Sequence, residues 1–163
     1  MSLIIGIENC KVDTNGRFKF PNALKKQLDT EDVRFVVRKS DYAQCLELWS
    51  YTSFISEVEK LRLQLNPYSK DDLKLLRRLT AGNIVEMDSN DRLLLPPEQK
   101  PHLNNAKDVV LEGVGDHVEI WSREQYDQMN GEATDFASLA DKRLGHIAPA
   151  AVANLDEKLK PGE

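Results

Sequence analysis

Cysteine and long apolar runs are both scarce in this chain of 163 residues. Its two cysteines, Cys10 and Cys45, lack the Cys-x-x-Cys spacing of metal and redox sites, so both are interpreted as small core residues rather than as a disulfide. No apolar run approaches the roughly 18 residues of a membrane span, and the opening residues lack the basic region of a signal peptide. We therefore expect a cytoplasmic protein with no membrane partner.

Motifs of catalysis are missing as well. His102, His117 and His146 are scattered along the chain and show no metal-ligand spacing. The Gly113-Val114-Gly115 stretch lacks the third glycine of a dinucleotide fingerprint and is interpreted as a turn between two strands. Neither a Gly-x-Ser-x-Gly elbow nor a phosphate-binding loop is found. The sequence therefore predicts a protein that is not an enzyme and that uses no metal, cofactor or small-molecule substrate.

The balance of charge is acidic overall but uneven along the chain. A formal net charge of -5 argues against nucleic-acid binding, because neutralisation of phosphates supplies most of the non-specific affinity. From Lys11 to Lys39, however, eight basic residues stand against four acidic ones. This segment is free to present a basic surface to an anionic partner.

A duplication organises the chain. The stretch from Asp13 to Pro21 returns 75 positions later as Asp88 to Pro96, with Asp, Asn, Arg and Pro in the same places. Each copy is followed by an apolar strand and then by a strand that ends in Trp-Ser, at Trp49 and Trp121. An ordered double copy of this kind indicates a repeat. Because each repeat is only about 45 residues long, we expect the copies to pack against each other or against other subunits.

The first copy contains the signal for a tight turn. The Asn15-Gly16 dipeptide predicts a two-residue turn with positive φ, and with it a β-hairpin from Cys10 to Phe20. Alternation after the turn places Arg17 and Lys19 on one side of the strand, opposite two phenylalanines. One side of this strand is expected to pack in a core, while the other is free to touch a ligand.

The second copy keeps this plan with different chemistry. Asp91 replaces Gly16 at the turn, and Leu94 replaces Lys19 on the strand. Aspartate tolerates the left-handed region better than most residues but less well than glycine, so this turn is expected to form with some strain. The second ribbon is therefore predicted to be stiffer and less basic. After the strand, the first copy predicts a short helix from Asn22 to Leu28, whereas prolines in the second copy leave room for one helical turn.

Helical patterns join and follow the copies. Apolar spacing predicts a helix that ends at Asn66-Pro67 and another that begins at Ser69, which together form a hairpin between the copies. A capping box that starts at Ser122 predicts a further helix after the second copy. From Gly131 onward the apolar positions thin out, so a loosely attached or disordered tail is expected.

Arg17 and Lys19 are the candidate functional residues of the first copy. An exposed arginine just past the turn of a two-stranded ribbon can enter a major groove, where arginine grips guanine O6 and N7 with two parallel bonds. The spacing allows a second interpretation equally well, in which Arg17 pairs with Asp13 and only locks the hairpin. The neighbouring Lys11 and Arg34 either contact phosphates or belong to an ordinary solvated face.

These motifs together resemble those of the MraZ family, whose members carry two tandem SpoVT-AbrB domains. The resemblance rests on Asp13-x-x-Gly16-Arg17-x-x-x-Pro21, on Asp88-x-x-x-Arg92-x-x-x-Pro96 and on the strands that end in tryptophan. It implies an α+β fold of two tandem AbrB-like swapped-hairpin β-barrel half-domains, joined by a helical hairpin and related by a pseudo-two-fold. The implied boundaries are 7–52 and 82–124 for the two domains, 53–80 for the helical linker hairpin, and 125–163 for a C-terminal helix and flexible tail.

The resemblance also implies a function. Members of the family assemble into closed homo-oligomeric rings, bind repeated boxes in double-stranded promoter DNA at the nucleoid, and regulate transcription of the division and cell-wall gene cluster. Their Asp-x-x-Gly-Arg element contacts DNA, which makes Arg17 the expected base reader and its basic neighbours the expected phosphate contacts. The candidate DNA-binding residues are Asp13, Gly16, Arg17, Lys19, Lys11, Arg34 and Arg92.

Two other classes of function stay open. One is an assembly scaffold, a ring whose ribbons bind protein with little DNA specificity, as the overall negative charge would suit. Salt distinguishes it from a DNA-binding protein, because contacts with phosphates weaken steeply as salt rises. The other is an antitoxin. Such proteins resemble one copy followed by a long acidic tail, whereas residues 131–163 hold four basic and six acidic residues.

Overall fold

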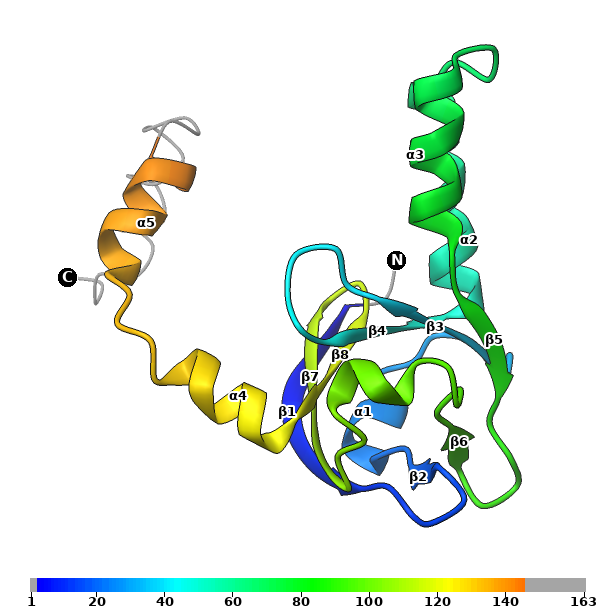
Figure 1. Cartoon of the computed structure of the whole chain (residues 1–163), viewed down its shortest axis with the longest axis vertical. Helices are drawn as coiled ribbons and strands as arrows, with labels where there is room; N and C mark the ends of the chain where they lie inside the picture. The colour runs from blue at the N-terminus through cyan, green and yellow to red at the C-terminus, as the bar shows by residue number, and fades with distance from the viewer. Residues whose placement is uncertain (1–2, 146–163) are drawn as a thin grey trace, which may run out of the picture. The chain divides into compact units, whose positions relative to one another are not determined.

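The strands of the two repeats are joined into two sheets (Figure 1). The computed structural model describes residues 3–145. A six-stranded sheet has the order β1-β7-β8-β4-β3-β5, and a two-stranded ribbon pairs β2 with β6; the strand pairs are antiparallel. The strands are β1 (Ile4–Lys11), β2 (Arg17–Lys19), β3 (Arg34–Lys39), β4 (Leu46–Ser50), β5 (Asn83–Glu86), β6 (Arg92–Leu94), β7 (Asp108–Gly115) and β8 (Val118–Ser122).

Helices connect these strands and follow them. The mixture of helices with antiparallel sheet confirms the predicted α+β class. The helices are α1 (Asn22–Lys25), α2 (Tyr51–Gln64), α3 (Lys70–Thr80), the 3-10 helix η1 (Lys100–Leu103), α4 (Arg123–Asn130) and α5 (Phe136–Leu144).

The first strand of each repeat pairs with a strand of the other repeat. β1 lies beside β7 of the second copy, and β5 lies beside β3 of the first copy. The copies also meet in the middle of the large sheet, where Glu47 on β4 faces Glu119 on β8. In the ribbon, Phe18 on β2 faces Leu93 on β6. The expectation that the copies pack against each other is thus confirmed.

This exchange corrects the predicted hairpin from Cys10 to Phe20. The turn forms, but β1 pairs with β7 in the large sheet while β2 pairs with β6. A tight-turn dipeptide specifies a reversal of the chain and not the strand with which each arm pairs. Pairing β2 with β6 buries Phe18 against Leu93, which a hairpin within one short copy could not do. The prediction of two ribbons of different charge is wrong for the same reason, because the copies share one ribbon.

The register of the ribbon relates the copies by an approximate two-fold. Its central residue faces its own counterpart at the 75-residue offset, and each outer residue faces the counterpart of the other outer residue. The three facing pairs are Arg17 with Leu94, Phe18 with Leu93, and Lys19 with Arg92.

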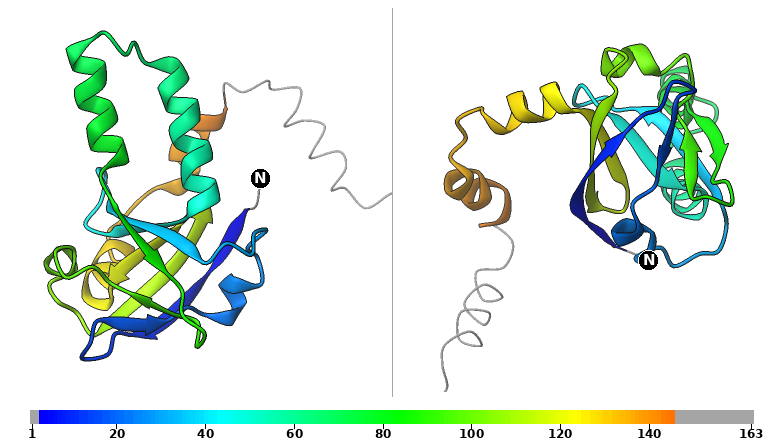
Figure 2. Two further views of the ribbon diagram at one scale, coloured as in Figure 1. Left: turned by 90° about the vertical axis from the view of Figure 1, so that its right-hand side faces the viewer. Right: turned by 90° about the horizontal axis from the view of Figure 1, so that it is seen from below.

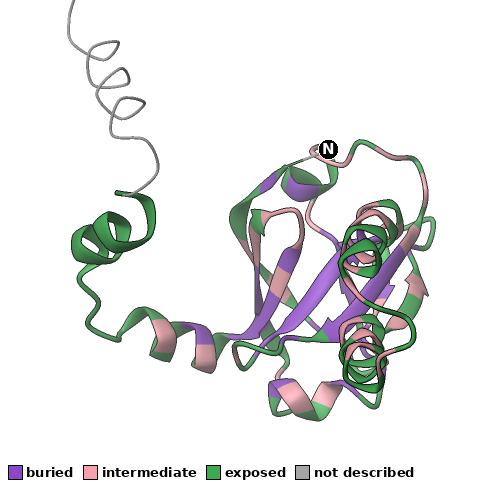
Figure 3. Ribbon diagram, turned by 90° about the horizontal axis from the view of Figure 1, so that it is seen from above, coloured by how far each residue is buried: buried purple, intermediate pink, exposed green. Residues whose placement is uncertain are grey.

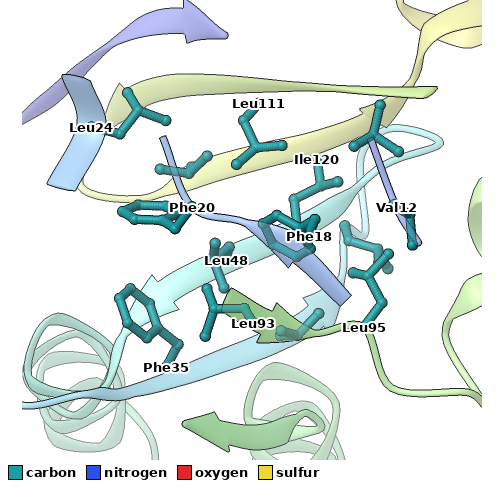
Figure 4. Close-up of a cluster of buried hydrophobic side chains, with 14 of the residues drawn as sticks. Val12, Phe18, Phe20, Leu24, Phe35, Leu48, Leu93, Leu95, Leu111 and Ile120 are labelled. Carbon is teal, nitrogen blue, oxygen red and sulfur yellow. The ribbon is translucent and has the colours of Figure 1, made fainter. Parts of the chain in front are cut away.

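The main core lies between the ribbon and the large sheet, with side chains from both repeats (Figure 4). Phe20, just after β2, packs against Phe35 of β3 with ring centroids 5.5 Å apart. The predicted alternation is confirmed, because Phe18 and Phe20 are buried while Arg17 and Lys19 are exposed. The ribbon is therefore a lid on the core with one face directed to solvent.

On the other face of the large sheet, each tryptophan packs against the first turn of the helix that follows it. Trp49 contacts Phe54 of α2 with ring centroids 5.9 Å apart, and Trp121 contacts Tyr126 of α4 at 6.4 Å. The serine after each tryptophan accepts a backbone N–H at 3.2 Å and so caps the helix. The predicted helix start at Ser122 is confirmed.

The predicted helical hairpin between the copies is also confirmed. Ser69 Oγ accepts the Asp72 N–H at 3.3 Å at the start of α3. The hairpin of α2 and α3 projects away from the sheet, at the end opposite the ribbon (Figure 2). After β2, α1 ends at Lys25, which is earlier than predicted, and the chain continues in a turn in which Leu28 N–H donates to the Lys25 carbonyl at 3.1 Å.

Both thiols are free. Cys45 is fully buried, and Cys10 is half-buried against the main core. Burial raises the pKa of Cys10 to about 11 and also raises the pKa of Cys45. The interpretation of both as core residues is confirmed, and neither thiol has the lowered pKa of a reactive cysteine.

The chain divides into two units at Met129. In the second unit, Asp135 caps α5 by accepting the Ser138 N–H at 3.2 Å, and residues 136–144 are all exposed (Figure 3). The expectation of a loose or disordered tail covers residues 131–163. Of these, 146–163 lie outside the described residues, and His146 lies there too.

Candidate nucleic-acid interface

The first turn, residues 13–17, is held by the side chain of Asp13. Its Oδ1 accepts the backbone N–H groups of Asn15 and Arg17, both at 2.9 Å. The Asp13 N–H donates to the Arg17 carbonyl at 2.8 Å, and the Gly16 N–H donates to the Asp13 carbonyl at 3.0 Å. Gly16 has a φ of +83°, a conformation that glycine adopts without steric penalty. The hydrogen bond from Arg17 N–H is the main reason that the pKa of Asp13 is lowered.

The Asp13 carboxylate therefore accepts hydrogen bonds from the backbone of the turn and does not pair with the guanidinium of Arg17. None of the ion pairs within residues 3–145 involves Arg17, whose side chain is exposed. The two arginines of the ribbon, Arg92 and Arg17, only add to the lowering of the Asp13 pKa through their charges. The turn is thus locked without the Arg17 side chain, which is left available to a ligand.

The second turn, residues 88–92, repeats this network. Asp88 Oδ1 accepts the N–H groups of Asn90 at 2.8 Å and of Arg92 at 2.9 Å. Asp91 takes a φ of +60°, so the prediction that it turns in the left-handed region is confirmed. Its carboxylate forms an ion pair with Lys25 Nζ at 2.7 Å.

Three basic side chains lie on the exposed face of the ribbon. Arg17, Lys19 and Arg92 are exposed, and Leu94 is half-buried beside them. Lys19 and Arg92 face each other across the strands, and like charges in that position destabilise a sheet. An anionic partner would relieve this repulsion, and a two-stranded ribbon has the dimensions to enter a major groove.

Two of the predicted phosphate contacts lie off the ribbon. Lys11 is exposed at the end of β1, opposite Asp108. Arg34, on β3, donates from Nη2 to Asp32 at 2.7 Å, and its guanidinium carbon lies 3.8 Å from the centroid of the Tyr51 ring. The hydrogen bonds from Arg34 lower the pKa of Asp32 to about 2. The charge of Arg34 is therefore already neutralised within the protein, so a phosphate would gain less from contact with Arg34 than from contact with an unpaired arginine.

Sequence reasoning missed Lys100, which reaches the first turn from the other copy. Its ammonium lies against Gly16, in the space that a Cβ on that residue would fill, and its Cε would be 2.5 Å from such a Cβ. Lys100 is the counterpart of Lys25 at the 75-residue offset. Each of these lysines therefore lies over the turn of the opposite copy. The offset was a usable signal, but only the exchange of strands shows which turn each lysine covers.

The chemistry of this site is that of charge and hydrogen bonding. In the described part of the chain, no three side chains of His, Cys, Asp or Glu are grouped so that they could hold a metal. Among the same residues, no helix is both long and apolar enough to cross a bilayer. The ribbon offers guanidinium and ammonium donors, the groups that bind phosphate and guanine in protein–DNA complexes.

Comparison with known proteins identifies the family. The model of the family described as "MraZ protein, putative antitoxin-like" matches residues 79–145. A protein of Flavobacterium psychrophilum named Transcriptional regulator MraZ is 36% identical over 150 residues, which cover 90% of this chain and 95% of the relative. The chain belongs to the MraZ family. The resemblance predicted from the two Asp-to-Pro motifs is therefore confirmed.

Further MraZ proteins match over a similar length. Transcriptional regulator MraZ of Christiangramia forsetii is 36% identical over 146 residues, covering 88% of this chain and 94% of its own. Transcriptional regulator MraZ of Cytophaga hutchinsonii is 35% identical over 146 residues, covering 88% and 96%. Each match is long enough to include the helical hairpin and the second turn, wherever it begins in this chain.

Proposed function

We propose that this protein is a transcriptional regulator that binds double-stranded promoter DNA through the ribbon of β2 and β6. The observation that carries this function is the convergence of Arg17, Lys19 and Arg92, from both repeats, on one exposed face. The names of the MraZ relatives, which denote transcriptional regulators rather than enzymes, support it.

Within the ribbon, Arg17 is the chief base reader. It is exposed, it follows a turn that is rigid without it, and it takes part in none of the ion pairs within residues 3–145. A guanidinium in that position can donate two parallel hydrogen bonds to guanine O6 and N7. Lys19 and Arg92 supply the adjoining positive charge, and Asp13 and Gly16 act by shaping the turn.

The remaining predicted contacts are peripheral. Lys11 contacts a phosphate beside the ribbon. Arg34 is kept as a predicted phosphate contact with a smaller effect, because Asp32 already matches its charge. The proposed regulator acts at the nucleoid in the cytoplasm, on the promoter of the division and cell-wall gene cluster.

The proposed architecture is the swapped-hairpin one, with SpoVT-AbrB domains at 7–52 and 82–124, a linker hairpin at 53–80 and a C-terminal segment at 125–163. The exchange of β1 and β5 between the repeats supports it. Exposed apolar side chains support assembly into a closed homo-oligomeric ring, since Leu63 in the helical hairpin is 87% exposed and Ile5 on β1 is 70% exposed. A ring would bind repeated promoter boxes tightly, because each contact after the first is intramolecular.

The test is a titration of the protein against the DNA upstream of its own gene and against a scrambled duplex, at low and moderate salt. Arg17→Ala is expected to lower the affinity for the promoter duplex and the preference over the scrambled one, by roughly 1–3 kcal/mol for a lost bidentate contact. Arg143→Ala, at an exposed position of α5, is the matched control and should bind as the wild type does.

Thermal unfolding should be the same for Arg17→Ala and the wild type, because the turn is held by the Asp13 carboxylate and the backbone. Weak, equal binding to both duplexes that Arg17→Ala leaves unchanged would overturn the proposed function. It would favour the assembly scaffold instead.

A further inference from the structure

A shallow depression lies beside each turn, and the two depressions are counterparts at the 75-residue offset. The first depression, beside the first turn, is lined by residues that include Asp13, Lys100, Asn105 and Lys107. It therefore holds two lysines against one carboxylate, and that carboxylate already accepts two backbone N–H groups. The Lys107 carbonyl accepts the Val12 N–H at 2.7 Å, which fixes this segment beside the turn.

The second depression has the opposite charge. It is lined by residues that include Lys25, Glu31, Asp32, Asp88 and Asp91, one lysine against four carboxylates. Asp32 stands at the offset position where the first depression has Lys107, and Asp91 stands where the first turn has Gly16. The same fold thus builds one basic and one acidic depression.

The residue in the left-handed position of each turn determines whether the lysine that lies over that turn forms an ion pair. Gly16 has no side chain, and the Lys100 ammonium occupies the space where one would be. No ion pair within residues 3–145 involves Lys100. At the second turn the Asp91 carboxylate forms an ion pair with Lys25 Nζ at 2.7 Å. One lysine is therefore available to an outside anion, and the other is neutralised by its own turn.

We infer that the first depression is a DNA-phosphate site, in which Lys100 and Lys107 bind one backbone phosphate beside the base-reading Arg17. At the second turn, the ion pair between Lys25 and Asp91 prevents the equivalent site from binding a phosphate. This inference rests on the proposed function. An ammonium is a common phosphate ligand, and the Asn105 amide adds a neutral donor in the same depression. The four carboxylates of the second depression would repel a phosphate.

The experiment measures the affinity for the promoter duplex over a range of salt concentrations, for the full chain and its variants. Lys100→Gln should make the fall of log affinity with log salt less steep, by at most about 0.9, and should lower the affinity by at most roughly eightfold at 0.1 M salt. These limits are the counterion release of one whole phosphate, of which Lys107 keeps a part. Lys100→Arg keeps the charge and should restore both. Lys74→Gln, at an exposed position of α3, is the matched control and should leave both unchanged.

The second turn provides the gain-of-function arm. Asp91→Asn removes the charge that neutralises Lys25 and keeps a side chain that tolerates positive φ. Lys25 is then free to bind a phosphate, so the salt dependence should become steeper and the affinity should rise, by less than Lys100→Gln lowers them because Glu31, Asp32 and Asp88 remain in the second depression. Adding Lys25→Gln to Asp91→Asn should cancel the gain.

Arg17→Ala, measured in the same series, distinguishes failure of the phosphate site from failure of the proposed function. If Arg17→Ala loses selective binding while Lys100→Gln and Asp91→Asn keep the wild-type slope, the phosphate site is overturned and the proposed function stands. If Lys100→Gln lowers the affinity without changing the slope, or Lys100→Arg does not restore it, Lys100 only supports the turn and the inference is again wrong. If Arg17→Ala has no effect, the proposed function and the inference fall together.

Discussion

The two turns of the ribbon have almost the same backbone and very different electrostatics. In each, an aspartate accepts two N–H groups, at 2.9 Å in the first turn and at 2.8 and 2.9 Å in the second. They differ at two positions: Ser89 replaces Thr14 and keeps a hydroxyl, and Asp91 replaces Gly16 and adds a charge. The comparison shows that the capping aspartate specifies the turn, while the residue in the left-handed position determines whether the lysine over the turn forms an ion pair.

The largest expected effect tests whether the two copies share one core or are structurally independent. Phe18→Ala and Leu93→Ala remove the two facing side chains at the centre of the ribbon, and each is expected to lower the free energy of unfolding by about 2–5 kcal/mol. Because both side chains lie in one core, urea unfolding of either variant should still show a single transition. Two transitions, with only the altered copy lost early, would show that each repeat has its own core.

A smaller change should convert the first turn into the second. Gly16→Asp is expected to place a carboxylate beside Lys100 and to neutralise it, as Asp91 neutralises Lys25. The affinity for promoter DNA should fall by at most roughly eightfold at 0.1 M salt, as for Lys100→Gln, because the same phosphate contact is weakened. The double variant Gly16→Asp/Asp91→Gly exchanges the residues in the left-handed positions and should recover part of the affinity, because Lys25 loses its ion pair while Asp32 stays where the first depression has Lys107. A double variant as weak as Gly16→Asp alone would mean that the two ends are not interchangeable.

The smallest expected effect is on stability at low pH, and it should be the same for both turns. The pKa values of Asp13 and Asp88 are lowered, in each case mainly by a backbone hydrogen bond from the arginine of the turn. Because each folded-state pKa lies below the unfolded value near 3.9, the stabilisation is complete above about pH 4 and is lost as the pH falls through the folded-state pKa. Melting temperatures measured from pH 6 down to pH 2 should therefore fall less in Asp13→Asn and in Asp88→Asn than in the wild type. A difference between the two variants would show that the caps are unequal.

The sequence was sufficient for what depends on neighbouring residues. The alternation of Arg17 and Lys19 with buried phenylalanines, the helix caps at Ser69 and Ser122 and the positive φ of Asp91 were predicted, because a few adjacent side chains and backbone groups decide each of them. The DNA-contacting roles stay predictions, although the structure brings Arg17, Lys19 and Arg92 onto one face.

What the sequence did not predict depends on which distant segments meet. The Asn15-Gly16 dipeptide encodes the reversal of the chain, but the choice between pairing β2 with β1 or with β6 depends on burying Phe18 against Leu93. Lys100 could not be placed for the same reason, since it lies in a different copy from the turn that it covers. The position of Asp32, two residues before Arg34, was a local signal of their ion pair that the sequence reasoning did not use.

The pairing of Phe18 with its own counterpart means that the ribbon is built like the centre of a homodimer, although one chain supplies both halves. In a true homodimer every substitution appears twice, so the two ends of such a ribbon would always be identical and a bound duplex could lie on it in either direction. Here the halves are encoded separately, and the exchange of one glycine for one aspartate changes a single end. Covalent fusion of the repeats thereby gives the ribbon two different ends, so the proposed DNA partner is expected to bind in one direction only.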